Sequence, residues 1–243
     1  LIALRARFDA RGEPERSPLF LPVHEPEPLL ALALQQDDAL LRDGGRFGNF
    51  RSPGFQRALE FYVGLFRAGL APQLGLEVGN LYDEFARGNF VFYIGGPWQI
   101  GEFRRRLPAE LARSWATAPL PGRDGPGSSL AFGSSLVVFS GSRKKEGAWQ
   151  LIEYLSRPDV QRRFYQLTGD LPPRRESWRA PELDSDEHVA AFRSQLERIE
   201  PTPSVPEWER ILAEVKIIGE RAARGRVGVA EAAAELDART DRI

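Results

Sequence analysis

Residues 90–98 read FVFYIGGPW. The first five are apolar and rich in aromatic and β-branched residues, which predicts a buried strand. Two glycines and a proline then turn the chain, and Trp98 opens a predicted helix. In α/β sheets, ligands bind at the carboxyl ends of strands, and this corner is such an end. The stretch therefore predicts an α/β fold and a candidate ligand site at the same corner.

Trp98 is the candidate that this corner presents most directly. An indole offers a flat apolar face on which the C–H face of a sugar ring can stack. Gly96 would let a ligand approach the backbone. Burial of Trp98 in the core is equally consistent with the sequence. Trp208 follows a proline-rich loop and starts another predicted helix, so it is a second candidate, whereas Trp115, Trp149 and Trp178 are interpreted as packing residues.

Strands and helices are predicted to alternate on both sides of this stretch. Apolar runs predict strands at Leu19–Val23 and Ser134–Ser140. Ser52 and Pro53 are typical of a helix start, because serine caps and proline fits the first turn. Ser142 is a second predicted cap. The last predicted helix, residues 230–243, looks exposed. The alternation favours an α/β fold over a sandwich or a bundle.

Composition excludes several classes of function. The 243 residues carry a net charge of −1, without the basic excess typical of nucleic-acid binding. The absence of cysteine excludes disulfides, thiolate nucleophiles and cysteine-based zinc sites. No metal site and no cofactor motif is predicted. His188 lies in an acidic run at a helix start and is interpreted as a surface residue.

The chain begins with Leu1 and contains no methionine. We therefore expect a processed or truncated product, or a sequence from which methionine positions are missing. No signal peptide or membrane-spanning run is visible. If the protein is exported, we expect its signal to lie upstream.

The spacing of Glu25 and Glu27 bears on whether these carboxylates bind a ligand or catalyse a reaction. A glycosidase needs two carboxyl groups on opposite sides of a scissile bond, and residues i and i+2 of one loop reach such positions with difficulty. Binding or plain solvation is favoured, and His24 in the same loop is interpreted as structural or ligand-contacting. Two alternatives stay open: a carbohydrate-active hydrolase using Glu25 and Glu27, and a non-catalytic interaction domain with Trp98 buried.

Five segments of the chain form an ordered pattern. They are Phe85-Ala86-Arg87-Gly88 through Gly95-Gly96-Pro97-Trp98, Ala118-Pro119-Leu120-Pro121-Gly122, Gly133-Ser134-Ser135-Leu136 through Ser142, Ala148 to Ser156, and Thr168-Gly169-Asp170-Leu171-Pro172. Together they cover nearly the whole chain, and their order and spacing are more specific than any one of them. In this order they resemble the family 1 extracellular solute-binding proteins of ABC sugar importers, the maltose-binding-protein-like group.

The resemblance implies a periplasmic-binding-protein type II-like fold with two lobes joined by a hinge, in which the N-terminal part of the first lobe is absent from this chain. Residues 1–129 would form the first segment of the second, C-terminal lobe. Residues 130–175 would return to the first, N-terminal lobe. Residues 176–243 would complete the second lobe as a helical C-terminal segment.

The resemblance also implies roles for single residues. Trp98 takes the place of the aromatic that stacks on sugar, and Glu25 that of a hydrogen-bonding glutamate. Glu27 departs from the family, which often has an aromatic there. Phe132 replaces the first glycine of a Gly-Gly pair, so its bulk would narrow the cleft or add a stacking face. The remaining implied ligand-binding residues are Gly96, Gly133, Ser134, Trp208 and His24.

The implied function is capture of a sugar or oligosaccharide in the cleft between the lobes and delivery to membrane permease subunits, with no chemistry on the solute. The protein would need no cofactor, bind no nucleic acid and be a monomer. Its location would be periplasmic or otherwise extracytoplasmic, with a lipid anchor as an option.

Overall fold

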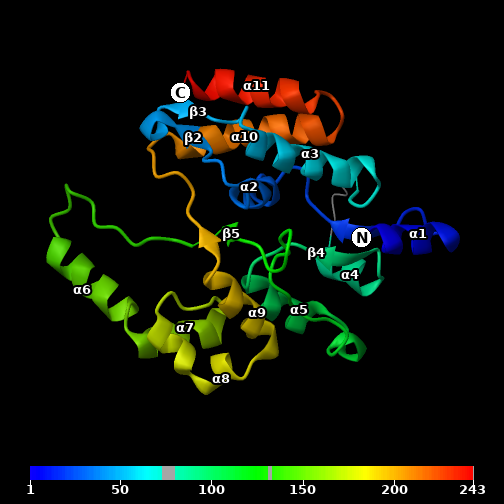
Figure 1. Cartoon of the computed structure of the whole chain (residues 1–243). Coiled ribbons are helices and arrows are strands. Elements are labelled where there is room, and N and C mark those ends of the chain that lie inside the picture. The colour runs from blue at the N-terminus through cyan, green and yellow to red at the C-terminus, as the bar shows by residue number, and fades with distance from the viewer. Residues whose placement is uncertain (73–79, 131–132, 243) are drawn as a thin grey trace. The chain divides into compact units, whose positions relative to one another are not determined.

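The computed structural model describes residues 1–72, 80–130 and 133–242 (Figure 1). The chain divides into two compact units. Unit 1 comprises Leu1–Ile94, Leu120–Leu130 and Arg198–Ile243, and unit 2 comprises Gly95–Pro119 and Ala131–Glu197. Within the described ranges, no helix is both long enough and apolar enough to cross a membrane.

Unit 1 mixes helices with short strands. Its elements are α1 (Ile2–Ala10), β1 (Ser17–Phe20), α2 (Glu27–Leu34), β2 (Leu41–Arg42), the 3-10 helix η1 (Asp43–Gly45), β3 (Phe47–Gly48), α3 (Pro53–Arg67), α4 (Leu81–Ala86), β4 (Phe90–Tyr93), β5 (Ser129–Leu130), β6 (Ile199–Glu200), α10 (Trp208–Ala223) and α11 (Val229–Thr240).

The elements of unit 2 that the structure describes are all helical. They are α5 (Trp98–Arg106), η2 (Ala109–Leu111), α6 (Lys145–Leu155), α7 (Pro158–Thr168), η3 (Arg175–Arg179), α8 (Pro181–Asp184) and α9 (Glu187–Leu196).

Helix α3 forms where the cap and the apolar spacing predicted it. The Ser52 hydroxyl accepts a hydrogen bond from the backbone N–H of Phe55 at 3.3 Å, and Pro53 stands at the first helical position. The apolar residues Phe55, Leu59, Tyr62 and Phe66 share one face and are each no more than 2% exposed. This face is the centre of the unit 1 core.

Helices α10 and α11 complete that core beside α3 (Figure 1). Ile211, Val215 and Ile218 of α10 are buried in that core at helical spacing. The prediction that the last helix is exposed is wrong, because Leu236 and two neighbouring alanines of α11 are fully buried. Alanine-rich sequence hides this burial, since small side chains produce a weak apolar pattern even on a face that packs closely.

The strands of unit 1 pair in twos. Strand β1 pairs in parallel with β4, β2 pairs antiparallel with β3, and β5 pairs in parallel with β6. The predicted strand at residues 90–94 forms as β4. Its predicted burial is wrong beyond Phe90, because Val91 and Phe92 are 40% and 51% exposed. Among the described residues its sheet has two strands, so much of β4 lacks cover.

The predicted strand over 19–23 begins earlier, at Ser17, and ends at Phe20. Pro22 has no N–H to donate to a ladder, which agrees with this early end. Leu21 and Val23 are nevertheless buried in the core of unit 1. The apolar run 19–23 therefore predicted the burial of this segment correctly, but not the bounds of the strand.

Unit 2 has a small core of its own. Ile100 of α5, Trp178 of η3, Leu183 of α8 and Val189 of α9 are buried together, with Trp115 packed against them. The indole N–H of Trp178 donates to the Pro172 carbonyl at 2.7 Å. The prediction that Trp115 and Trp178 are packing residues is confirmed.

Residues 134–140 are irregular and exposed, so the predicted strand there is wrong. A strand needs a neighbour to complete its backbone hydrogen bonds, and no strand pairs with this segment in the described parts of the chain. Ser142 is not the cap of α6, whose N-cap is Lys144. The Ser142 hydroxyl accepts instead from the Lys144 N–H at 3.2 Å, and Ser142 lies two residues before the actual N-cap.

Unit 2 also exposes many large apolar side chains between residues 136 and 167. Trp149, predicted to pack, is 57% exposed, so that prediction is wrong. A helix in a globular protein normally buries its apolar stripe, and α6 and α7 do not. The exposed set is Leu136, Val137, Phe139, Trp149, Leu151, Tyr154, Leu155, Phe164 and Leu167.

Candidate functional site

The predicted site residues belong to both units. Unit 1 holds His24, Glu25, Glu27 and Trp208, and unit 2 holds Gly96, Trp98, Gly133 and Ser134. Phe132 lies outside the described residues.

The carboxylates of unit 1 lie where the chain turns from β1 into α2. His24 and Glu25 are exposed, and Glu27 is the first residue of α2, where a negative charge complements the helix dipole. Partial burial raises the pKa of Glu25, and the neighbouring charge of Glu27 raises it further, against smaller opposing effects of His24 and Lys216. Glu25 thus retains its proton to higher pH than an ordinary glutamate and can both donate and accept hydrogen bonds there.

Trp208 lies at an open surface depression of unit 1, with a volume of about 620 Å³. It is the first residue of α10 and packs partly against the core. The depression combines an indole, prolines and a few polar groups, which is the composition of many small-molecule sites. Its lining is Thr202, Pro203, Ser204, Val205, Pro206, Trp208 and Glu209.

In unit 2, Trp98 stands at the predicted turn into a helix and is 46% exposed. Its interpretation as a core residue is therefore wrong. A β-carbon on Gly96 would overlap the six-membered ring of the Trp98 indole. Gly96 is thus the residue against which the indole rests, and the missing side chain is what leaves room for the ring.

Gly133 and Ser134 lie in the exposed irregular segment that follows. No helix or strand orients them, and their ligand-binding role stays a prediction.

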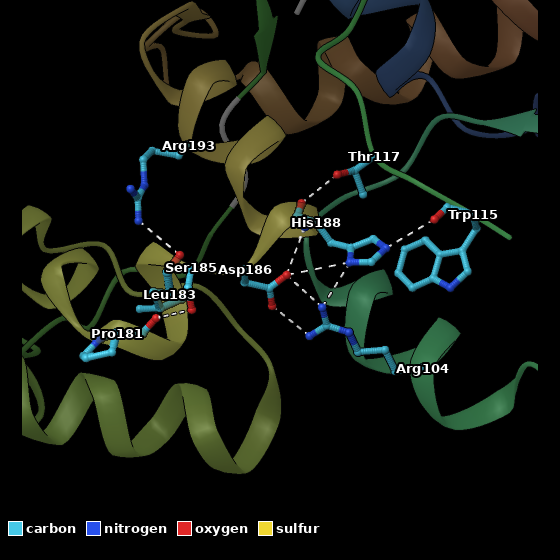
Figure 2. Close-up of polar contacts among 9 residues, drawn as sticks. All are labelled: Arg104, Trp115, Thr117, Pro181, Leu183, Ser185, Asp186, His188 and Arg193. Atoms are coloured by element: carbon cyan, nitrogen blue, oxygen red, sulfur yellow. Dashed lines mark hydrogen bonds and ion pairs between the residues drawn. The ribbon is translucent and has the colours of Figure 1, made fainter. Parts of the chain in front are cut away.

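A polar cluster in unit 2, made of Arg104, Asp186 and His188, is the feature that the sequence did not predict (Figure 2). Asp186 and His188 are largely buried, whereas the side chain of Arg104 is 46% exposed. His188 is 8% exposed, so its interpretation as a surface residue is wrong. Its ring lies 3.9 Å from that of Trp115, centroid to centroid, and its Nε2 lies 3.3 Å from the Trp115 carbonyl oxygen. Arg104 donates to both carboxylate oxygens of Asp186 at 2.8 Å, and its Nη2 lies 3.1 Å from Nδ1 of His188.

The contacts of His188 leave it unsuited to catalysis. A carbonyl oxygen only accepts, so Nε2 carries a proton and donates it to Trp115, and Nδ1 accepts from Arg104. Both ring nitrogens are occupied, and neither contacts a hydroxyl nucleophile. Across the residues that the structure describes, no group of three or more His, Cys, Asp or Glu side chains is arranged to hold a metal.

One member of this cluster, Asp186, could have been recognised from the sequence as a helix cap. Asp186 precedes a helix and accepts a hydrogen bond from the His188 N–H at 3.0 Å, as an N-cap aspartate does. Its partner Arg104 lies 82 residues earlier, and nothing local connects the two.

Comparison with known proteins gives consistent results. Residues 26–191 match the model of the bacterial extracellular solute-binding protein family. The solved structure of the sugar-binding protein MalE from the phytopathogen Xanthomonas citri is 46% identical, with a TM-score of 0.91 over 99% of this chain and 61% of that one. A galactooligosaccharide-binding protein of Bacillus subtilis is 28% identical over 155 residues, or 63% of this chain and 35% of that protein.

A maltooligosaccharide ABC transporter solute-binding lipoprotein of Streptococcus pneumoniae is 22% identical over 134 residues, or 55% of this chain and 31% of that protein. The chain thus spans between 31% and 39% of the curated relatives it matches. The predicted α/β fold of the periplasmic-binding-protein type II class is confirmed, as part of that fold. The chain belongs to the bacterial extracellular solute-binding protein family.

Proposed function

We propose that this chain is part of the solute-binding component of an ABC importer, which captures a sugar or oligosaccharide and passes it to a membrane permease without chemical change. The observation that carries the proposal is the half-exposed Trp98 resting against Gly96 at the start of α5. An exposed indole costs hydrophobic free energy unless it has a ligand to cover it, and sugar rings stack on such faces. The relatives named for galactooligosaccharide and maltooligosaccharide support the same class of ligand.

The roles of single residues follow from their chemistry. Trp98 stacks on a sugar ring, and Glu25, Glu27 and His24 offer hydrogen bonds to sugar hydroxyls. The raised pKa of Glu25 supports this, because a partly desolvated carboxyl gains more from a hydroxyl partner than a fully hydrated one does. Trp208, with the depression that it lines, is a further contact surface. Gly96, Phe132, Gly133 and Ser134 complete the proposed set, and Glu27 and Phe132 would make the preferred sugar differ from maltose.

The proposed partners are a sugar ligand and permease subunits of the transporter. The protein would act as a monomer outside the cytoplasm and bind no nucleic acid. The family description, extracellular, supports that location, and the lipoprotein among the relatives supports a lipid anchor as an option.

We propose further that residues 130–175 belong to the first lobe, and residues 1–129 and 176–243 to the second. The uncovered apolar side chains between residues 136 and 167 support this division, because an exposed apolar stripe of such length normally packs against another part of a fold. The matched proteins are longer and contain residues that could supply that cover. In a longer protein that contains this chain, Phe139→Glu would then destabilise far more than it does in the 243 residues alone.

The binding proposal is tested by calorimetry of the chain with maltotriose and with galactooligosaccharides. We expect Trp98→Ala to weaken binding by about 30-fold or more, the effect of removing an aromatic anchor of about 2 kcal/mol. Trp149→Ala is the matched control, because it removes an indole from the same unit that is 57% exposed, against 46% for Trp98. Equal effects of the two variants would contradict the role of Trp98.

The hydrolase alternative makes a different prediction for the same samples. It requires release of shorter sugars during long incubation, and loss of that release in Glu25→Gln. Chromatography that finds only intact oligosaccharide, together with measurable binding, supports capture without turnover.

A further inference from the structure

Helix α5 connects the candidate stacking residue, Trp98, to the polar cluster of unit 2 through Arg104. Trp98 is its first residue, and Arg104 lies six residues later, about 9 Å along the helix axis. Between them, Ile100 and Phe103 are buried in the core of unit 2. The indole and the guanidinium therefore do not need to touch in order to be coupled, since both are fixed to one short rigid element.

The apolar contacts of α5 alone do not determine its angular position. Hydrophobic burial is non-directional, so the two buried side chains of this nine-residue helix constrain its roll less tightly than a directional contact does. A guanidinium that donates to both oxygens of one carboxylate has a fixed geometry. The contact of Arg104 with Asp186 is of this kind, with both distances at 2.8 Å.

The partner side of this contact is itself held in place (Figure 2). Asp186 caps α9 through the His188 N–H, and the Thr117 hydroxyl donates to the His188 carbonyl at 2.7 Å. Burial raises the pKa of Asp186, but the hydrogen bond and charge of Arg104 outweigh this and lower it. The side chain of Asp186 is 10% exposed, so it provides an ionised and immobile anchor.

We infer that Arg104, Asp186 and His188 are positioning residues that set the roll of α5 and so the direction in which Trp98 presents its indole to a sugar. The inference rests on the proposed function for its sugar, but its structural part concerns Trp98 alone. Gly96 holds the indole from one side, and the polar cluster fixes the helix that carries it. Removing the bidentate contact between Arg104 and Asp186 then changes the surroundings of Trp98, although neither residue is Trp98 itself.

The test uses the whole chain labelled with 5-fluorotryptophan, whose five fluorine resonances are assigned by single Trp→Phe changes. The variant is Arg104→Lys, which keeps the positive charge and removes the bidentate geometry. The matched control is Arg105→Lys, because Arg105 lies next on the same helix and forms an ion pair with Glu102 of that helix. Trp178, which lies in the core of unit 2, reports that this unit remains folded.

We expect Arg104→Lys to shift or broaden the Trp98 resonance while the Trp178 resonance stays in place, and Arg105→Lys to leave both unchanged. The affinity for maltotriose should fall about tenfold, equivalent to one charge-assisted hydrogen bond. Asp186→Asn should do the same, because the amide keeps an oxygen for the cap and loses the charge. This second variant decides the question if Arg104→Lys disturbs Trp178.

If the Trp98 resonance does not move in Arg104→Lys or in Asp186→Asn, and only the Trp115 resonance does, the inference is overturned. The cluster would then only stabilise its immediate surroundings. If the unaltered chain does not bind maltotriose, the proposed function fails for that sugar, and the fluorine spectrum still decides whether the cluster orients Trp98.

Discussion

Gly96 and Trp98 show how much one residue's environment can alter its interpretation. From the sequence, Gly96 reads as a place where a ligand approaches the backbone, and Trp98 reads equally as core or as site. In the structure the indole is half exposed, and a β-carbon at position 96 would overlap its ring. Gly96 therefore fixes where the Trp98 indole lies, and we expect it to influence a ligand by positioning that indole.

This pairing predicts an unequal response to two glycine substitutions. Gly96→Ala should displace the indole, weaken sugar binding and alter Trp98 fluorescence. Gly101→Ala lies in α5 with open space around the new methyl group, and should stabilise the chain by about 0.5–1 kcal/mol. Thermal unfolding and calorimetry of both variants check this, and an unaltered affinity in Gly96→Ala would refute the contact role of Gly96.

At the scale of elements, local signals succeed where the chemistry of one turn is sufficient. Ser52 and Pro53 start α3, and the αL glycines 69, 169 and 225 follow the ends of α3, α7 and α10. The same reasoning fails for residues 134–140, because a strand depends on a neighbour that local sequence does not contain. It fails for Ser142 too, since α6 begins two residues later than that cap requires.

Substituting the two serines should therefore lower the free energy of unfolding by different amounts. Ser52→Ala removes the only side-chain acceptor that the structure records for the Phe55 N–H, and should cost about 1 kcal/mol. Ser142→Ala removes an exposed hydrogen bond that caps no helix, and should cost less than about 0.5 kcal/mol. Urea unfolding measures the free energy of unfolding of both variants. Equal decreases would show that the Ser52 cap stabilises the chain no more than the exposed hydrogen bond of Ser142 does.

At the scale of the whole molecule, the residues that the structure describes form two hydrophobic clusters, each confined to one unit. The cluster of unit 1 joins α2, α3, α10 and α11, whereas that of unit 2 rests on a few side chains from α5, η3, α8 and α9. Regions with few buried apolar contacts open more readily. We therefore expect unit 2 to be the less stable unit. It also carries Trp98, the main candidate for binding, and the uncovered apolar side chains.

Hydrogen exchange should resolve the two units. Leu236→Ala in unit 1 and Leu183→Ala in unit 2 each remove a side chain no more than 1% exposed, at a cost of about 2–5 kcal/mol. We expect faster exchange in the substituted unit and little change in the other, with unit 2 less protected from the start. A common loss of protection in both units would mean that the chain unfolds as a single cooperative body.

The sequence by itself determined the elements whose causes are local: the cap and apolar face of α3, the inward residues of α10, the turn at Gly96 and the family membership that the ordered segments implied. The tertiary structure alone decided which side chains are covered. It buried the alanine face of α11 and His188, and left Trp98, Trp149 and residues 136–139 exposed. The physical reason is that a cap or an apolar stripe acts within one turn, whereas burial and the Arg104–Asp186 pair depend on residues far apart in the chain.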